Sequence, residues 1–367
     1  MKKICLILSI LTISLTSVFA KAALQSGESW MILQRAEHEF DNNNFSEAMR
    51  YAQDAVAKRK HESESESKIL TNAVTPYQVR RVGDLIPDVL KVLEERQEYS
   101  AMDIIKKWTG KYGNEYFEDS IAKLREFINS RKDYPEAYIL IAKIYRIEGE
   151  FSMAQDYLEK ARTTSSLLEV PEMENDILFI IADIAEYTHD VPTQEKALLL
   201  IAKNSGDFSN ETLKQALIRT SKSKKEDNSS KFFKMYRINS IACLNAYYKL
   251  SKIYDSSKKY EEAYITNLYG VLIAFTHLNS LLEERESDYQ FSDLKTFFKT
   301  VSRYSDMVKW CNDNSFWEGF YNIYAYGTKC GYQRFPKDVI IVMSNSCPEL
   351  YWKNAAQKCV EEAGLSK

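Results

Sequence analysis

The sequence predicts an all-α protein built from antiparallel helix hairpins that pack side by side. Apolar residues recur at steps of three and four along most of the chain, which is the spacing of one helix face. Glycine and proline number only 11 and 7 in 367 residues, which suits long helices better than a sheet with many tight turns. Residues 135–161 form the clearest hairpin, with a turn at Gly149. One such hairpin cannot bury its apolar face alone, so it predicts neighbours of the same kind.

The chain begins with the pattern of an export signal. Lys2 and Lys3 precede an uncharged apolar run over residues 4–19, and Ala20 or Ala22 completes a small-residue cleavage site. We therefore expect a cleaved signal peptide and an exported, periplasmic protein with no membrane span after cleavage. An uncleaved anchor is the alternative, because the apolar run is at the short limit for crossing a bilayer.

The hairpin at 135–161 has large and small residues in a particular order. The two apolar faces consist of Tyr138, Ile141, Ala142 and Tyr145, followed by Phe151, Ala154, Leu158 and Ala161. Ala142 and Ala154 fall where the two helices approach closely. This order resembles the tetratricopeptide repeat (TPR), a helix–turn–helix unit of roughly 34 residues. The resemblance implies a right-handed α-solenoid of antiparallel hairpins with a long inner surface.

Two further stretches carry the same pattern. A second copy spans 244–263, with a polar turn at 255–259, and it departs from the repeat at Asn267 and Gly270. A third and weaker copy lies at 29–58. Between the copies the helical spacing continues without the small residues.

These observations divide the chain into six parts. They are a signal peptide (1–20), an N-terminal hairpin (21–60), a linker (61–82), a solenoid (83–220), a loop (221–230) and a C-terminal solenoid (231–367). The linker is predicted because Glu and Ser alternate from Glu62 to Ser67 between polar neighbours. Residues 338–343 have the β-branched content of a strand, but helical hairpins on both sides favour a helix.

Five cysteines remain after removal of the leader: Cys243, Cys311, Cys330, Cys347 and Cys359. An odd number leaves at least one thiol free or paired with another chain. If a disulfide forms within the chain, Cys330 with Cys359 is our choice, because both would end helices at the same edge of the solenoid. Cys347 and Cys359 lie too far apart along one helix, about 18 Å, to be joined.

No motif in the sequence predicts catalysis, a metal or a cofactor. His38-Glu39 begins a zinc-protease pattern, but Asn42 stands where the second histidine belongs. The net charge of −3 becomes −5 when the leader and its two lysines are removed, which disfavours a nucleic-acid partner. Many tyrosines and phenylalanines gather in the last third, where packing or a binding patch would account for them.

The TPR resemblance implies a scaffold that holds a protein or peptide in the groove lined by the first helix of each hairpin. By matching position, that groove consists of Glu136, Ile139, Lys143, Arg146, Asn245, Tyr248, Lys252 and Asp255. The leading hypothesis is therefore an exported, non-catalytic scaffold of the cell envelope. The alternative is an accessory protein of a transport system that holds a small apolar ligand. An enclosed cavity walled by Tyr and Phe would favour the ligand, and an open groove of mixed charge the scaffold.

Overall fold

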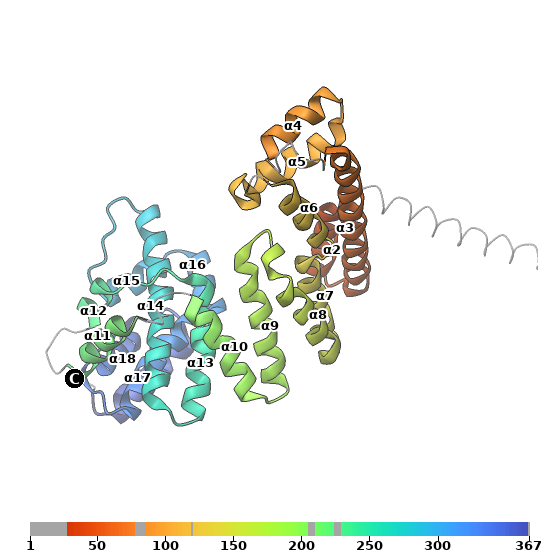
Figure 1. Ribbon diagram of the computed structural model, residues 1–367. Coiled ribbons are helices and arrows are strands. Elements are labelled where there is room, and N and C mark those ends of the chain that lie inside the picture. Colours follow the sequence, from red (N-terminus) through yellow and green to blue (C-terminus); the bar gives the residue numbers. More distant parts are fainter. Residues whose placement is uncertain (1–27, 78–84, 119, 205–209, 224–228, 366–367) are drawn as a thin grey trace, which may run out of the picture. The chain divides into compact units, whose positions relative to one another are not determined.

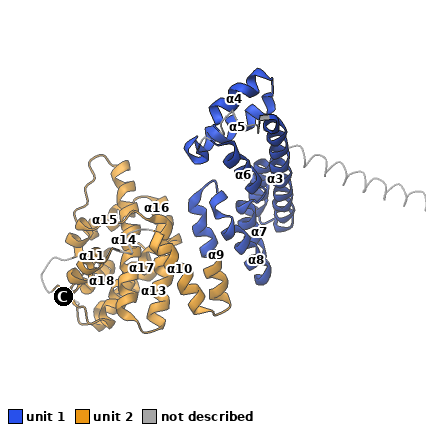
Figure 2. Cartoon of the chain, viewed as in Figure 1, with its two compact units in different colours: residues 1–180 blue, residues 181–367 orange. Residues whose placement is uncertain are grey.

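The computed structural model describes residues 28–77, 85–118, 120–204, 210–223 and 229–365. All elements in this part of the chain are helices, and the predicted all-α class is confirmed. The signal peptide lies outside the described residues, as do residues 224–228 of the predicted loop at 221–230. The ends of that loop belong to helices, since Ser221 and Lys222 end one helix and Ser229 begins the next. The chain divides into two compact units, residues 1–180 and residues 181–367 (Figure 2).

Unit 1 contains the following helices: α2 (Ser29–Asp41), α3 (Phe45–Val74), η1 (Thr75–Tyr77), α4 (Ile86–Glu95), α5 (Tyr99–Tyr112), η2 (Glu115–Phe117), α6 (Ile121–Ser130), α7 (Pro135–Glu148), α8 (Phe151–Thr163), η3 (Ser165–Leu167) and η4 (Pro171–Met173). The division between the units falls inside α9 (Glu174–Tyr187) and not at the predicted 221–230 loop.

Unit 2 continues with the remaining helices: α10 (Val191–Asn204), α11 (Glu211–Lys222), α12 (Ser229–Met235), η5 (Ile241–Cys243), α13 (Leu244–Ser256), α14 (Tyr260–Arg285), α15 (Leu294–Val301), α16 (Ser305–Asp313), α17 (Phe316–Lys329), α18 (Arg334–Ser346) and α19 (Leu350–Glu362). The predicted helix at 338–343 is confirmed within α18.

All three predicted hairpins form: α2–α3, α7–α8 and α13–α14. The turn of the second one needs Gly149, because its φ of +80° lies in the left-handed region that a residue without a side chain adopts at little cost. Ala142 and Ala154 are fully buried on α7 and α8, as expected for a close helix approach.

The predicted linker at 61–82 is wrong over most of its length, because α3 continues as one helix to Val74 (Figure 1). The alternating Glu and Ser residues do not form a solvated loop. Ser63 is 4% exposed and donates a hydrogen bond to the carbonyl oxygen of Ile128 on α6. Polar side chains that have partners elsewhere in the fold can therefore occupy a buried helix face.

The length of α3 gives unit 1 two apolar cores. Its first half packs with α2 and α7 around Ala36, Ala52 and Ile141. Its last turns pack with α4, α5 and α6 around Leu93, Ile105 and Leu124. Hairpin α2–α3 thus contacts α7 directly, and α4–α6 form a separate cluster between them in the sequence. This order departs from a simple succession of neighbouring repeats.

Unit 2 is organised around α14, which contacts α11, α13, α15 and α17. Among the described helices, α14 is the one long and apolar enough to cross a membrane, and 83% of its most apolar window is buried inside the unit. Such burial is what a core helix shows.

The two departures from the repeat pattern have a structural reason. Tyr248 of α13 lies against both Gly270 of α14 and Gly319 of α17, where a Cβ atom would approach its ring or hydroxyl within 2.7 Å. Asn267 is fully buried and donates a hydrogen bond of 2.8 Å to the carbonyl oxygen of Gly319. The small residue at 270 and the polar residue at 267 therefore let three helices pack closely.

The aromatic residues of the last third serve mainly in packing. Phe316, Trp317 and Phe320 are at most 1% exposed, and their rings pack against one another and against Phe298, mostly edge to face. Among the described residues, Cys330 and Cys359 are not joined by a disulfide.

Candidate binding cleft

The four predicted groove residues on α7 lie in or beside the interior of unit 1. Ile139 is 1% exposed and Glu136 is 9% exposed. Glu136 accepts a hydrogen bond of 2.7 Å from the backbone N–H of Glu169, and Lys143 forms an ion pair of 2.9 Å with Asp176 of α9. Arg146 is half-buried. The face of α7 that the repeat pattern selects is thus used mainly for contacts within the unit.

The four predicted groove residues on α13 are divided between core and surface. Tyr248 is buried, so its assignment to an open groove is wrong. Lys252 pairs with Glu318 at 2.9 Å and Asp255 with Lys329 at 2.5 Å, both across to α17. Asn245 is exposed. Helix α17 therefore covers much of the face that the repeat pattern assigns to a ligand.

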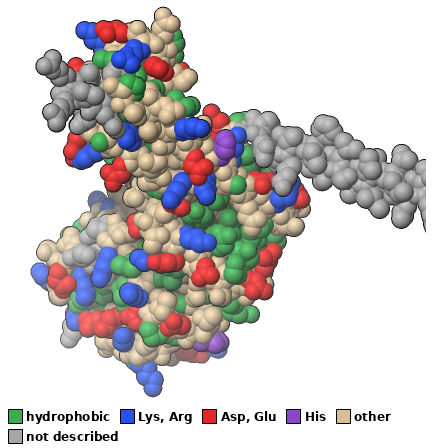
Figure 3. Space-filling view, turned by 45° about the vertical axis from the view of Figure 1, so that its right-hand side comes forward, with side chains coloured by type: hydrophobic (Ala, Val, Ile, Leu, Met, Phe, Trp, Pro, Cys, Tyr) green, Lys and Arg blue, Asp and Glu red, His purple; other side chains and the backbone are tan. Residues whose placement is uncertain are grey.

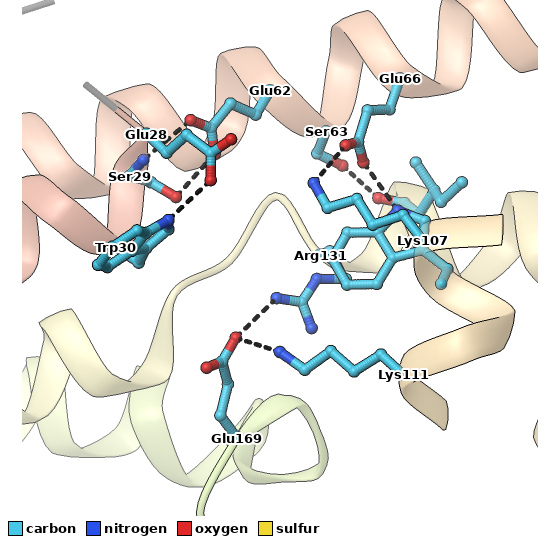
Figure 4. A network of polar contacts seen from close by, with 12 residues as sticks. Glu28, Ser29, Trp30, Glu62, Ser63, Glu66, Lys107, Lys111, Arg131 and Glu169 are labelled. Atoms are coloured by element: carbon cyan, nitrogen blue, oxygen red, sulfur yellow. Dashed lines mark hydrogen bonds and ion pairs between the residues drawn. The ribbon is translucent and has the colours of Figure 1, made fainter. Parts of the chain in front are cut away.

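A polar network holds unit 1 together at the middle of α3 (Figure 4). Glu62 accepts hydrogen bonds from the backbone N–H and the hydroxyl of Ser29, at 2.9 and 2.7 Å. One turn later, Glu66 accepts from Lys107 and from the indole N–H of Trp108, both at 2.9 Å. The Glu/Ser segment thereby joins α3 to α2 and α5.

The second part of this network is centred on Glu169, which follows α8. Lys111 donates to its carboxylate at 2.8 Å, and the guanidinium of Arg131 lies 3.6 Å away (Figure 4). Arg131 is 5% exposed and stacks on the ring of Trp108. Burial raises the pKa of Glu169, but Lys111, Arg59 and Arg131 outweigh burial and lower its pKa below the ordinary value. Most of these groups pair with one another inside the unit, and we assign the network a structural role. The Nε atoms of Arg59 and Arg131 are buried without a hydrogen-bond partner.

A cleft of about 460 Å³ lies in unit 2 between α11 and the hairpin α13–α14. Its floor is formed by Tyr254, Ile265, Thr266 and Tyr269, each less than 10% exposed. Ile218 of α11 adds a half-buried apolar wall. The cleft therefore has an aromatic and aliphatic floor whose side chains are mostly covered by protein.

The two rims of the cleft carry opposite charges. Lys214 and Lys222 lie on α11, and Glu261 and Glu262 lie at the start of α14. Lys222 and Glu261 form an ion pair of 3.2 Å that joins the rims at one end. A hydrogen bond from Tyr332 at 2.8 Å, together with Lys222, lowers the pKa of Glu261 despite burial, so Glu261 stays negative at neutral pH.

Tyr254 of the cleft is a neutral donor and not a base. Burial and the neighbouring Glu195 raise the pKa of Tyr254 to about 12. Within the described residues, no group of three His, Cys, Asp or Glu side chains is arranged to hold a metal ion. The cleft is thus suited to binding an apolar group flanked by charges. Lysines, acids and hydrophobic side chains are likewise interspersed over the face seen in Figure 3.

The sequence does not reveal this cleft, for a physical reason. Its two sides come from α11 and α14, whose residues are separated by about forty positions. The pattern around Lys222 suggests a solvated loop, and the second helix of a hairpin is not expected to line a TPR groove. The spacing of Ile265 and Tyr269 places both on one helix face and could have indicated an apolar binding surface. The same spacing is equally typical of a helix face buried in a core.

Comparison with known proteins gives relatives of unknown role. An uncharacterized protein of Treponema pallidum is 27% identical over 337 residues, covering 90% of this chain and 89% of the relative. An uncharacterized protein of Borreliella burgdorferi is 24% identical over 230 residues, covering 56% of this chain and 71% of the relative. No family model matches the chain, and no solved structure matches it significantly. The treponemal relative nevertheless aligns across most of both units.

Proposed function

We propose that this protein is an exported, non-catalytic scaffold of the TPR-like kind, and that the cleft of unit 2 holds a segment of a partner protein in the cell envelope. One observation carries the proposal: an apolar, aromatic floor lies between a rim of two lysines and a rim of two glutamates. A peptide side chain that enters such a site is flanked by the backbone and the charged groups of the peptide. The lysines and glutamates of the rims can form hydrogen bonds and ion pairs with these groups. The repeated hairpins α7–α8 and α13–α14 support the TPR-like assignment.

A second candidate is a small apolar ligand, in the role of a transport accessory protein. The cleft volume of about 460 Å³ lies within the range of ordinary ligand pockets. Four charged side chains among ten lining residues count against a purely apolar occupant, since their desolvation would cost free energy without compensation. We therefore prefer a segment of a partner protein as the occupant of the cleft.

Photo-crosslinking in intact cells tests the proposal. A benzophenone amino acid replaces Gln215, an exposed residue that lines the cleft, and in a matched variant replaces Asn245, the exposed residue of the sequence-predicted groove. We expect a discrete protein adduct from position 215 and none from position 245. Absence of an adduct at 215, together with a small molecule in native mass spectra of the purified protein, would transfer the assignment to the ligand.

Export is tested separately by sequencing the N-terminus of the mature protein. A start at Lys21 or Ala23 supports cleavage of the leader, since these residues follow Ala20 and Ala22. A mature chain that keeps residues 4–19 and sediments with membranes would show an anchor instead.

A further inference from the structure

A second surface site lies in unit 1, between α6 and the end of α8. It is a groove of about 480 Å³. Tyr116 forms part of its wall and is 52% exposed, unlike the buried rings beside it. An exposed aromatic ring is by itself common, so the chemistry of its surroundings decides its meaning.

The ring of Tyr116 is held in place by other aromatic residues. Its centroid lies 5.4 Å from Tyr112, 5.1 Å from Phe117 and 5.4 Å from Phe127. Phe117 and Phe127 are themselves buried. One part of the Tyr116 ring is therefore fixed by packing while the rest faces the groove, so a ligand that stacks on it need not order it first.

The polar groups of the groove are mainly hydrogen-bond acceptors. Ser130, Thr163 and Thr164 each donate their hydroxyl hydrogen to a helix carbonyl, at 2.7, 2.9 and 2.7 Å. The lone pairs of these hydroxyl oxygens can still accept hydrogen bonds. The carboxylates of Glu126 and Asp133 add further acceptors to the same groove, and that of Asp133 also accepts a hydrogen bond of 3.1 Å from the hydroxyl of Tyr138.

The groove is net negative, because its lining carries the two carboxylates of Glu126 and Asp133 against one lysine. Lys123 is the cation among its lining residues, and it forms an ion pair with Glu118. An anionic ligand would meet the carboxylates of Glu126 and Asp133. A peptide backbone brings as many C=O acceptors as N–H donors, and the C=O groups would find few partners here. The groove thus disfavours an anion and suits a ligand with many O–H donors and an apolar face.

We propose that this groove binds a neutral saccharide. A sugar ring presents C–H groups on its face, which stack on Tyr116, and hydroxyl groups at its edge, which donate to Glu126 and the hydroxyl oxygens of Ser130, Thr163 and Thr164. The volume accommodates one or two sugar rings of an oligosaccharide chain. This inference is independent of the cleft in unit 2, because no residue lines both sites.

Binding of the full-length protein to an array of neutral, acidic and amino oligosaccharides tests the inference, followed by calorimetric titration with the best neutral glycan. Tyr116→Ala is expected to weaken the affinity about tenfold through loss of the stacked ring. Tyr116→Phe keeps the ring and retains binding within about threefold. Tyr99→Ala removes a comparably exposed tyrosine, 59% exposed and outside the groove, and leaves the affinity unchanged.

Glu126→Ala provides a variant that does not disturb the aromatic cluster, because Glu126 is exposed. It is expected to weaken saccharide binding severalfold while the thermal midpoint stays at the wild-type value. Three results would overturn the inference: no neutral glycan binds, binding persists in the folded Tyr116→Ala and Glu126→Ala variants, or a cationic amine such as spermidine competes at lower concentration than any glycan.

Discussion

The contact of Tyr248 with Gly270 and Gly319 gives the sharpest test of how unit 2 is packed. A Cβ added at Gly319 would lie 2.6 Å from the Tyr248 hydroxyl oxygen and 2.8 Å from Cε1 of its ring. The ring also lies close to the backbone of Gly270, where an added Cβ would be 2.7 Å from the same Cε1, so it has little room to shift. Gly319→Ala therefore inserts a methyl group where there is no space.

Two effects of opposite sign set the change in the free energy of unfolding that Gly319→Ala causes. Alanine favours a helix over glycine by about 1 kcal/mol. Overpacking a well-filled core costs about 1–3 kcal/mol, and a ring held from two helices places this case near the upper end. We expect Gly319→Ala to lower the free energy of unfolding of unit 2 by about 2 kcal/mol.

Urea unfolding followed by tryptophan fluorescence measures this change, since Trp317 on α17 is 1% exposed. Gly110→Ala is the control: it lies in helix α5 of unit 1, and its Cβ meets nothing within 4 Å. Only helix propensity then acts, and the variant is expected to stabilise unit 1 by about 0.5–1 kcal/mol.

A second substitution separates the two contacts of Tyr248. Its hydroxyl is buried without a hydrogen-bond partner, so Tyr248→Phe is expected to be neutral or to stabilise by up to about 1 kcal/mol. In this background the cost of Gly319→Ala falls, because the closest contact is gone. The cost of Gly270→Ala stays, because its Cβ meets ring carbons. Two results would refute this explanation: Gly319→Ala is as stable as the wild type, or Tyr248→Phe reduces the cost of Gly319→Ala and of Gly270→Ala equally.

Three further predictions concern the remaining structure. Ser65→Pro should destabilise unit 1 by about 3 kcal/mol in thermal unfolding, because α3 is continuous at this position. Ser65→Ala should leave the stability of unit 1 unchanged. Equal stability of the two variants would support the predicted linker instead of a continuous helix. Glu169 has a lowered pKa in the folded unit, so its charge stabilises the fold above its ordinary value of 4.5 and this contribution disappears as the pH falls through the folded-state pKa. Glu169→Gln should therefore lower the thermal midpoint by about 2 °C at pH 7, and a difference that persists at about pH 3 would contradict this. Alkylation of the denatured, unreduced mature protein should modify all five cysteines, and three modified thiols would reveal a disulfide.

The sequence predicted the local elements well because their signals are local. Gly149 marks a turn by its backbone freedom, and the apolar spacing on either side specifies two helix faces that need each other. The helix over 338–343 could likewise be chosen over a strand from its neighbours in the sequence. The Glu/Ser segment failed for the opposite reason: Ser63 is stable in a helix because of Ile128, which lies 65 positions away.

The groove prediction failed in a similar way. A repeat pattern specifies which helix face points inward, but it does not specify which helix covers that face. Lys252 and Asp255 are paired by residues of α17 that follow them by more than sixty positions. The cleft between α11 and α14 and the groove beside Tyr116 are also formed by residues from separate elements, so no single stretch of sequence predicts them.

The amino-acid sequence alone determined that this chain is helical, where its clear hairpins turn, and that hairpins at 29–58, 135–161 and 244–263 form, because periodicity and helix breakers act over a few residues. Only the tertiary structure decided that α3 continues through the Glu/Ser segment, that Tyr248 is a core residue between two glycines, and that a charged cleft lies beside α11. Each of these depends on the free energy of contacts between residues far apart in the chain, which local pattern does not contain.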